Sequence, residues 1–358
     1  RLRASWGSLP NPGWTPAPQR RRAGGWEEFL STVRAPACPG AGEGREAAIE
    51  ARQPGELVIE ARDLRMRYGT TEAVCGVDLE VRRGEVVAVL GPNGAGKTTT
   101  VEILEGYRRR TGGQVRVLGK DPERAGLDWR GRVGVVLQES RPERGLSVRE
   151  CLALYAGYHR RPRTVEELLE LVGLTPEADV RASRLSGGKQ RRLDVALALV
   201  GDPELVFLDE PTTGFDPAAR RAAWVMVADL RQLGATVLLT THYLEEAEAL
   251  ADRIAVIARG RIVAEGPPAR LGGRDRRPSR VVLRLEEDAP GRDLPPPLAD
   301  AARQPDGRLW FESADPLQAL AAIEAWARAG GRRISELEVR PPTLEEVYLE
   351  LTRDPEEP

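Results

Sequence analysis

The stretch from Gly91 to Thr98 constrains this chain more than any other part of its sequence. It reads Gly91-Pro92-Asn93-Gly94-Ala95-Gly96-Lys97-Thr98 and fits the pattern G-x-x-x-x-G-K-S/T. A valine-rich run at residues 85–90 precedes it, and a run with helical character at 99–107 follows. A buried strand, a glycine turn and a helix in this order are typical of a phosphate-binding loop. The sequence therefore predicts an α/β fold that binds a nucleotide.

The residue types in this loop suit phosphate chemistry. Glycines let the backbone turn tightly, so that its N–H groups point at phosphate oxygens. The helix that follows adds the positive end of its dipole. Lys97 supplies a point charge for the outer phosphates, and the Thr98 hydroxyl is a candidate ligand for magnesium. The alternative, a glycine-rich turn that holds a lysine by chance, does not explain the flanking strand and helix.

Composition excludes several other classes of protein. The 358 residues suggest one large domain or two to three smaller ones, and an apolar content of 41% is enough for a sizeable core. A net charge of −2 gives no overall attraction to nucleic acid. No segment approaches the roughly 18 apolar residues of a membrane span, and three scattered cysteines form neither a disulfide framework nor a metal site. We therefore expect a cytosolic protein that contacts a membrane only through partners.

The chain divides into four expected parts. Residues 1–54 are rich in Pro, Gly, Arg and Ala without a period, which predicts a disordered extension or, alternatively, a basic arm for membrane or nucleic acid. Strands alternate with helices over residues 55–268, which favours a mainly parallel sheet, with an inserted helical subdomain at about 140–200. Residues 269–280 are expected to be a linker. Residues 281–353 are expected to form a small α+β accessory domain with a packing, dimer-supporting or regulatory role.

Two further motifs accompany the loop. An apolar strand predicted at 205–208 ends at Asp209 and Glu210. Asp209 is placed to hold the hydration shell of a metal ion, and Glu210 to orient or deprotonate a water molecule. Upstream, a Ser186-Gly187-Gly188 turn opens a helix and makes a second candidate anion site. Taken singly, the two motifs also fit an ordinary acidic turn and a glycine-rich linker.

In this order the motifs resemble those of ATP-binding cassette (ABC) ATPases, and the resemblance covers about residues 57–266. Leu185-Ser186-Gly187-Gly188-Lys189-Gln190 resembles the signature motif of that family. The resemblance implies a P-loop NTPase fold of the ABC type, with an N-terminal antiparallel β subdomain and an inserted helical subdomain. It also implies ATP and Mg²⁺ as cofactors, and ATP hydrolysis with Lys97, Glu210 and His242 as catalytic residues.

The resemblance assigns further roles around the nucleotide. It implies that Tyr68 stacks on adenine and that Thr99 joins the phosphate loop in binding the nucleotide. Gln138 would sense magnesium and the γ-phosphate and couple the site to a membrane partner. His242 would reach the γ-phosphate. The implied metal ligands are Thr98, Gln138 and Asp209.

A dimer is the next implication of the resemblance. In this family the turn at residues 186–190, including Lys189 and Gln190, faces the γ-phosphate bound on a second subunit. Gly214-Phe215-Asp216 matches the loop that crosses the interface, although Phe215 replaces the more usual leucine. One phosphate loop and one signature per chain therefore imply a homodimer that closes around two ATP molecules and opens after hydrolysis.

Four stretches, at residues 135–140, 191–198, 212–217 and 342–348, resemble the exporter branch of daunorubicin-type and related ABC-2 multidrug ATPases. This resemblance implies a motor subunit that drives export of drug or lipid-like compounds through a separate transmembrane permease. It also implies a cytoplasmic location, peripheral on the inner face of the cell membrane, and no nucleic-acid partner. Two alternatives stay open at this point: a non-transport ABC ATPase in translation or DNA repair, and an importer ATPase.

Overall fold

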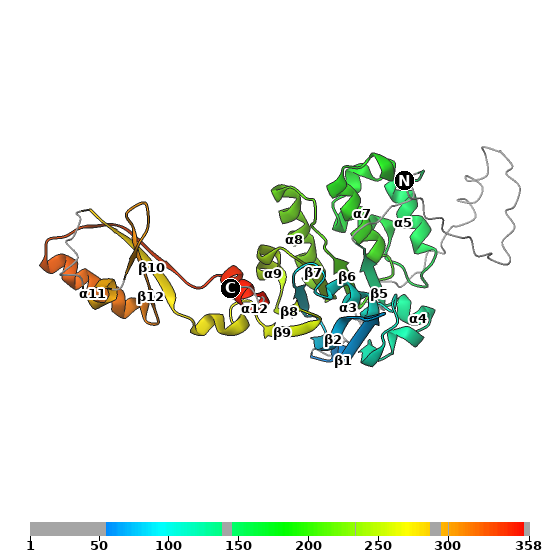
Figure 1. The fold of residues 1–358 in the computed structure, drawn as a ribbon. Coiled ribbons are helices and arrows are strands. Elements are labelled where there is room, and N and C mark those ends of the chain that lie inside the picture. The colour runs from blue at the N-terminus through cyan, green and yellow to red at the C-terminus, as the bar shows by residue number, and fades with distance from the viewer. Residues whose placement is uncertain (1–54, 138–144, 233, 287–294, 300, 354–358) are drawn as a thin grey trace, which may run out of the picture. The chain divides into compact units, whose positions relative to one another are not determined.

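The computed structural model describes residues 55–137, 145–232, 234–286, 295–299 and 301–353. The predicted extension at residues 1–54 and the predicted site residue Gln138 lie outside these ranges. Figure 1 shows the described part as a ribbon and labels many of its helices and strands. Within it, no helix is both long enough and apolar enough to cross a membrane.

A six-stranded sheet forms the centre of the nucleotide-binding part. Its strand order is β5-β6-β7-β3-β8-β9, and all neighbours are parallel except the edge strand β9. Every residue of β3, β6 and β7 is buried, as expected for a parallel sheet that is covered on both faces. The predicted mainly parallel core is confirmed. The strands are β3 (Val86–Leu90), β5 (Val133–Val136), β6 (Leu205–Asp209), β7 (Thr236–Thr241), β8 (Arg253–Ala258) and β9 (Arg261–Gly266).

A three-stranded antiparallel sheet of order β2-β1-β4 covers one face of the central sheet. Its strands are β1 (Leu57–Tyr68), β2 (Thr71–Arg82) and β4 (Gly112–Val117). Apolar residues of this sheet share a core cluster with Val87 and Val89 of β3, Phe207 of β6 and the helix α3 (Lys97–Leu104). This sheet is the antiparallel β subdomain that the family resemblance implies.

Helices cover the opposite face of the central sheet. The helical subdomain comprises α5 (Val148–Ala156), α6 (Val165–Leu171) and α7 (Gly187–Leu199), and α8 (Pro217–Gln232) and α9 (Leu244–Leu250) follow later in the chain. Their apolar residues share a second core cluster with Val86, Ala88 and Leu90 of β3. Ser147 and Thr164 form capping boxes at the starts of α5 and α6, because each exchanges hydrogen bonds with the glutamate three residues later. Shorter helical elements are η1 (Pro122–Arg124), α4 (Leu127–Arg130), η2 (Thr175–Glu177) and η3 (Ala182–Arg184).

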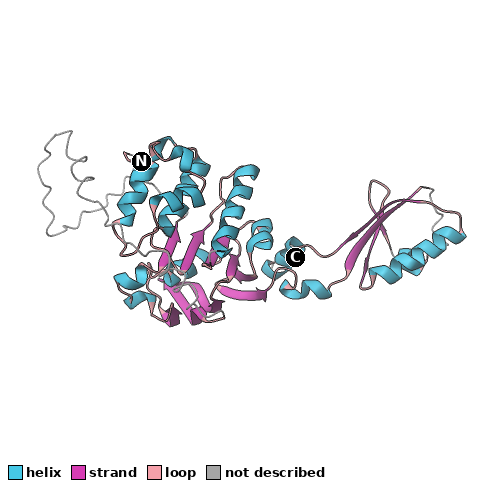
Figure 2. Cartoon of the chain, turned by 180° about the vertical axis from the view of Figure 1, so that it is seen from behind, coloured by secondary structure: helices cyan, strands magenta, loops and turns pink. Residues whose placement is uncertain are grey.

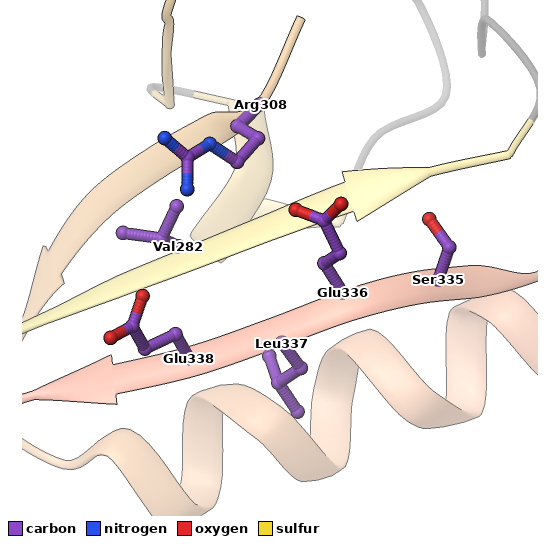
Figure 3. A pocket seen from close by; sticks show the side chains of 6 residues that line it. All are labelled: Val282, Arg308, Ser335, Glu336, Leu337 and Glu338. Atoms are coloured by element: carbon purple, nitrogen blue, oxygen red, sulfur yellow. The ribbon is translucent and has the colours of Figure 1, made fainter. Parts of the chain in front are cut away.

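The C-terminal part contains a second antiparallel sheet, whose strands are drawn in magenta in Figure 2. Its strand order is β11-β12-β10-β13. The 3₁₀ helix η4 (Leu271–Arg276) precedes it, inside the stretch expected to be a linker. The helix α11 (Pro316–Ala329) packs on the sheet through Ile323, against Val281, Leu283 and Phe311. A pocket on the sheet is lined by Val282, Arg308 and residues 335–338 of β13 (Figure 3). The remaining elements are β10 (Ser279–Leu285), α10 (Pro296–Ala299), β11 (Ala302–Arg303), β12 (Leu309–Ser313) and β13 (Ile334–Arg340).

The last helix, α12 (Leu344–Thr352), packs into the core of the nucleotide-binding part. Leu344 belongs to the same apolar cluster as the helical face of the central sheet, and Tyr348 and Leu351 pack against that cluster. An ion pair of 2.6 Å joins Glu350 Oε2 to Arg277 Nη1 next to η4. Sequence reasoning grouped this helix with the accessory domain, whereas its buried face lies against the α/β core. The division of the chain into domains stays a prediction.

We predict that Leu344→Ala lowers the free energy of unfolding by about 2–5 kcal/mol, because it leaves a cavity in a buried site. Urea unfolding followed by circular dichroism measures this change. The matched control is Leu349→Ala on the exposed face of the same helix, which should change stability by less than about 0.5 kcal/mol. Equal losses for the two variants would contradict the packing of α12 into the core.

Candidate active site

The loop at residues 91–98 joins the carboxyl end of β3 to α3, and two of its glycines are required by close packing. A Cβ atom on Gly91 would lie 2.2 Å from the carbonyl oxygen of Ile257. Gly96 has a φ of +100°, and a Cβ there would lie 2.4 Å from the carbonyl oxygen of Ala73. The loop is therefore held tightly against β8 and β2 while Pro92, Asn93 and Gly94 at its crest are exposed. The Thr98 side chain is also exposed, in the first turn of the helix.

Lys97 is buried beneath this loop. Its Nζ donates hydrogen bonds to the carbonyl oxygens of Gly91 at 2.8 Å and Pro92 at 3.1 Å. Burial lowers the pKa of the Lys97 ammonium, and the negative charges of Glu210 and Asp209 act in the opposite direction. The lysine and the two acidic residues, which lie more than a hundred positions apart in the sequence, therefore belong to one electrostatic site.

The two carboxylates at the end of β6 have different surroundings. Asp209 is buried, and its Oδ1 accepts a hydrogen bond of 2.5 Å from Thr240 Oγ1 of β7. Glu210 has a φ of +44°, in the left-handed region, and its Oε2 accepts a hydrogen bond of 3.1 Å from Thr213 Oγ1. This backbone conformation costs a non-glycine residue roughly 1 kcal/mol. The chain therefore turns sharply between the two carboxylates and separates them.

His242 lies directly after β7 and beside Glu210. Its Nδ1 is 3.4 Å from Glu210 Oε1. The imidazole ring packs on Tyr243 with the ring centroids 4.1 Å apart, and the guanidinium of Arg220 covers the Tyr243 ring at 4.0 Å. The His242 ring is thus supported by Tyr243 at the N-cap of α9, which Arg220 of α8 covers in turn, while part of the His242 side chain stays exposed.

Tyr68, at the end of β1, is close to the helix that follows the phosphate loop. Its hydroxyl lies 3.5 Å from Thr99 Oγ1, and its ring is about 41% exposed. The guanidinium of Arg108 lies 5.3 Å from the ring centroid and is held by a 2.6 Å hydrogen bond from Nε to Glu102 Oε2. Sequence reasoning missed Arg108, because a lone arginine in an arginine-rich stretch gives no signal.

The Ser186-Gly187-Gly188 turn lies at the start of α7, where Ser186 and Gly187 are exposed. The neighbouring side chains make local contacts. Lys189 Nζ pairs with Glu177 Oε1 at 2.6 Å, and Gln190 Nε2 donates to the Leu185 carbonyl at 3.1 Å. The turn is therefore fixed to its own helical subdomain and presents its backbone outward.

Arg191, next in the chain, ties that helix to the strand ends. Its guanidinium is buried and donates to the carbonyl oxygens of Asp209 at 2.8 Å and Pro211 at 3.2 Å, and also to that of Leu137. A buried charge with several carbonyl partners is a strong cross-link between elements. In the sequence, Arg191 was noted only as part of the stretch 191–198 that resembles the exporter branch, and its contacts with the strand ends were not predicted.

The segment Gly214-Phe215-Asp216 connects the acidic strand end to α8. Gly214 has a φ of +80°, which glycine adopts readily. Asp216 Oδ1 accepts a 2.8 Å hydrogen bond from the Ala219 N–H in the first turn of α8. Gly214 and Asp216 are exposed, so this segment is available to a partner. The structure brings Lys97, Asp209, Glu210 and His242 together, whereas Gln138 lies outside the described residues.

Known proteins are similar to this chain over most of its length. A family model described as ABC transporter matches residues 74–213. The daunorubicin resistance ATP-binding protein DrrA3 of Streptomyces coeruleorubidus is 41% identical over 80% of this chain and 93% of its own length. The Nod factor export ATP-binding protein I of Cupriavidus metallidurans is 39% identical over 82% of this chain and 97% of its own length.

Solved structures agree with these sequence relatives. The ADP conformation of an ATP-binding cassette from an ABC transporter superposes with a TM-score of 0.53 and 26% identity, covering 59% of this chain and 91% of that one. The cbiO1 subunit of an ABC transporter complex from Clostridium perfringens gives a TM-score of 0.55 and 25% identity, covering 60% and 90%. Both are cassettes with the P-loop NTPase fold predicted for this chain.

The fold and the site thus define a P-loop ATPase of the ATP-binding cassette class. The chain belongs to the ABC transporter family, among the ATP-binding subunits of exporters. It is an ATP-binding and ATP-hydrolysing motor subunit of a transporter, which confirms the family and the enzymatic activity predicted from the motifs.

A pH-dependent stability follows from Glu105, at the end of α3. Burial raises the pKa of its carboxyl to about 8, with the charges of Asp209 and Glu102 acting in the same direction. The folded protein then keeps a proton that the unfolded chain releases near pH 4.5. Stability should therefore fall as the pH rises from about 5 to about 8.

We predict that Glu105→Gln reduces this slope, because the amide does not titrate. Urea unfolding of both proteins at pH 5.5 and pH 8.5, conditions chosen to bracket the transition, measures the change. The exposed Glu170 serves as a control, since Glu170→Gln should leave the slope as in the wild type. A wild-type slope in Glu105→Gln would rule out a buried, protonated Glu105.

Proposed function

We propose that two copies of this chain hydrolyse ATP with Mg²⁺ at their shared interface and thereby drive export through a separate membrane permease. The observation that carries the proposal is the meeting of Lys97, Asp209, Glu210 and His242 at the carboxyl ends of three neighbouring strands, β3, β6 and β7. Ligands bind at this edge of parallel α/β sheets. Each residue there has a chemistry that phosphoryl transfer requires.

The proposed roles follow from the geometry. The loop N–H groups and the Lys97 ammonium bind the β- and γ-phosphates, and Tyr68, beside Thr99, stacks on the base. One oxygen of the Glu210 carboxylate accepts a hydrogen bond from Thr213. The carboxylate accepts a proton from the attacking water. His242, 3.4 Å from the other Glu210 oxygen, contacts the γ-phosphate side of the site.

The donor set at this edge fits magnesium. Thr98 offers an exposed hydroxyl and Asp209 a carboxylate, both oxygen ligands. Among the described residues no group of three or more His, Cys, Asp or Glu side chains is arranged to hold a metal. Mg²⁺ is usually held by one or two protein ligands together with water and substrate phosphates, so such a sparse set suits it. The ion, when bound, neutralises phosphate charge, and Gln138 stays a proposed further ligand.

A second copy of the chain is proposed to complete each site. The turn at residues 186–190 is anchored to its own helical subdomain and presents Ser186 and Gly187 at the start of a 13-residue helix. The N–H groups of such a helix end bind anions. These N–H groups would face the γ-phosphate of the ATP bound to the partner. The exposed residues Gly214 and Asp216 would contribute to the same interface. Hydrolysis would remove the bridging phosphate and release the dimer.

The relatives support the proposed transport reaction. One is named for daunorubicin resistance and another for Nod factor export. We propose that this subunit exports drug or lipid-like compounds, with the permease as its contact to the membrane, at the inner face of the cell membrane. Co-purification with a permease followed by a transport assay tests this proposal.

We predict that Lys97→Ala lowers ATPase activity at least about 100-fold, the loss that follows removal of one preorganised charge or donor. Phosphate release at saturating ATP measures it. Lys120→Ala is the matched control, because Lys120 is exposed on the turn after β4. Wild-type turnover by Lys97→Ala would refute the phosphate-loop assignment.

We predict that Glu210→Gln still binds ATP but hydrolyses it about 100- to 10,000-fold more slowly, because the amide cannot accept the water proton. Size-exclusion chromatography with Mg²⁺ and ATP should show this variant as a dimer and the wild type mainly as a monomer. Full ATPase activity in Glu210→Gln would mean that another residue deprotonates the water. A variant that is inactive and yet monomeric with ATP would argue against the composite site.

A further inference from the structure

We infer that Thr240 is a positioning residue that sets the geometry of both acidic residues in the ATP site. This inference rests on the proposed roles of Asp209 and Glu210. Thr240 lies on β7, directly opposite Asp209 of β6 in the parallel register. It is about 1% exposed, so its hydroxyl is shielded from water and relies on protein partners.

The Thr240 hydroxyl contacts both members of the acidic pair. Its Oγ1 is 2.5 Å from Asp209 Oδ1 and 3.0 Å from the Glu210 backbone nitrogen. The Glu210 N–H can only donate, so it occupies an acceptor position on Oγ1, and the hydroxyl proton goes to the Asp209 carboxylate. The direction of both hydrogen bonds is thereby determined.

The two hydrogen bonds act on different parts of the site. The bond to Asp209 fixes the side chain that is proposed to bind magnesium. The bond from Glu210 restrains a backbone with a φ of +44°, where the carboxylate leaves the strand toward His242. The Glu210 N–H also donates to the Thr240 carbonyl at 3.2 Å. One residue of β7 thus fixes the turn that separates the metal ligand from the base.

Valine is the test substitution, because it has nearly the shape of threonine without the hydroxyl. In Thr240→Val, Asp209 loses a donor and Glu210 keeps only the carbonyl contact. Loss of an outer partner of a metal ligand typically costs 10- to 100-fold in metal affinity or activity. We expect the Mg²⁺ concentration for half-maximal ATPase activity to rise by about that factor. Thr240→Ser, which keeps the hydroxyl, should retain most of the wild-type affinity for Mg²⁺.

A binding measurement separates this effect from a general loss of activity. The affinity for a fluorescent ATP analogue is measured with Mg²⁺ and with EDTA. Thr240→Val should weaken binding with Mg²⁺ and leave binding in EDTA unchanged. Thr240→Ala supplies the same comparison if the valine variant does not fold.

The matched control lies on the same strand. Thr236 is also fully buried, and its Oγ1 accepts a 3.0 Å hydrogen bond from the Gly84 N–H at the opposite end of β7. Thr236→Val should reduce stability without changing the Mg²⁺ dependence. An unchanged Mg²⁺ dependence in Thr240→Val, or the same change in Thr236→Val, would overturn the inference.

Asp209→Asn distinguishes this inference from the proposed function. If Asp209→Asn loses Mg²⁺-dependent binding while Thr240→Val does not, Asp209 binds the metal and Thr240 does not position it. If Asp209→Asn keeps wild-type Mg²⁺ dependence, the proposed metal site itself is wrong, and the inference about Thr240 is overturned with it.

Discussion

The register of three parallel strands sets the position of every acidic and basic group in the ATP site. Asp209 of β6 lies opposite Thr240 of β7, and Thr241 of β7 lies opposite Leu90 of β3. The strands therefore end at one level, and the loops that follow them meet. Successive side chains point to opposite faces, so a slip of one residue would turn Asp209 away from α3. Burial of both faces of β3, β6 and β7 prevents such a slip.

Buried polar groups extend this arrangement beyond the sheet. Arg191 joins the helix that begins at the Ser186-Gly187 turn to the carbonyls at the ends of β5 and β6. Leaving a buried guanidinium without partners is costly, so this cross-link resists breaking. The helical subdomain and the acidic strand end thus form one hydrogen-bonded unit.

Sequence patterns predicted the elements well where local signals were strong. The strand predicted at residues 85–90 is β3, and the helix predicted after the loop is α3. The strands β1 and β2 are long, with 12 residues each. Their polar and charged positions conceal the strand pattern, because one face of an antiparallel hairpin is exposed to solvent. The packing of α12 against the α/β core could not be predicted from the local sequence either, because the pattern of an amphipathic helix does not specify which surface the helix covers.

The sequence by itself determined the class of fold, the phosphate loop, the acidic pair and membership of the ABC family, because each depends on residue types at short, regular spacings. Only the tertiary structure decided how these parts meet. Lys97 lies near Asp209 and Glu210, His242 lies 3.4 Å from Glu210, and the Thr240 hydroxyl bonds the Asp209 carboxylate and the Glu210 backbone N–H. Such contacts join strands that are far apart in the chain, and their geometry depends on strand order and register. The physical reason is that hydrogen bonds and charges act over a few ångströms of space, whereas sequence motifs record only neighbours along the chain.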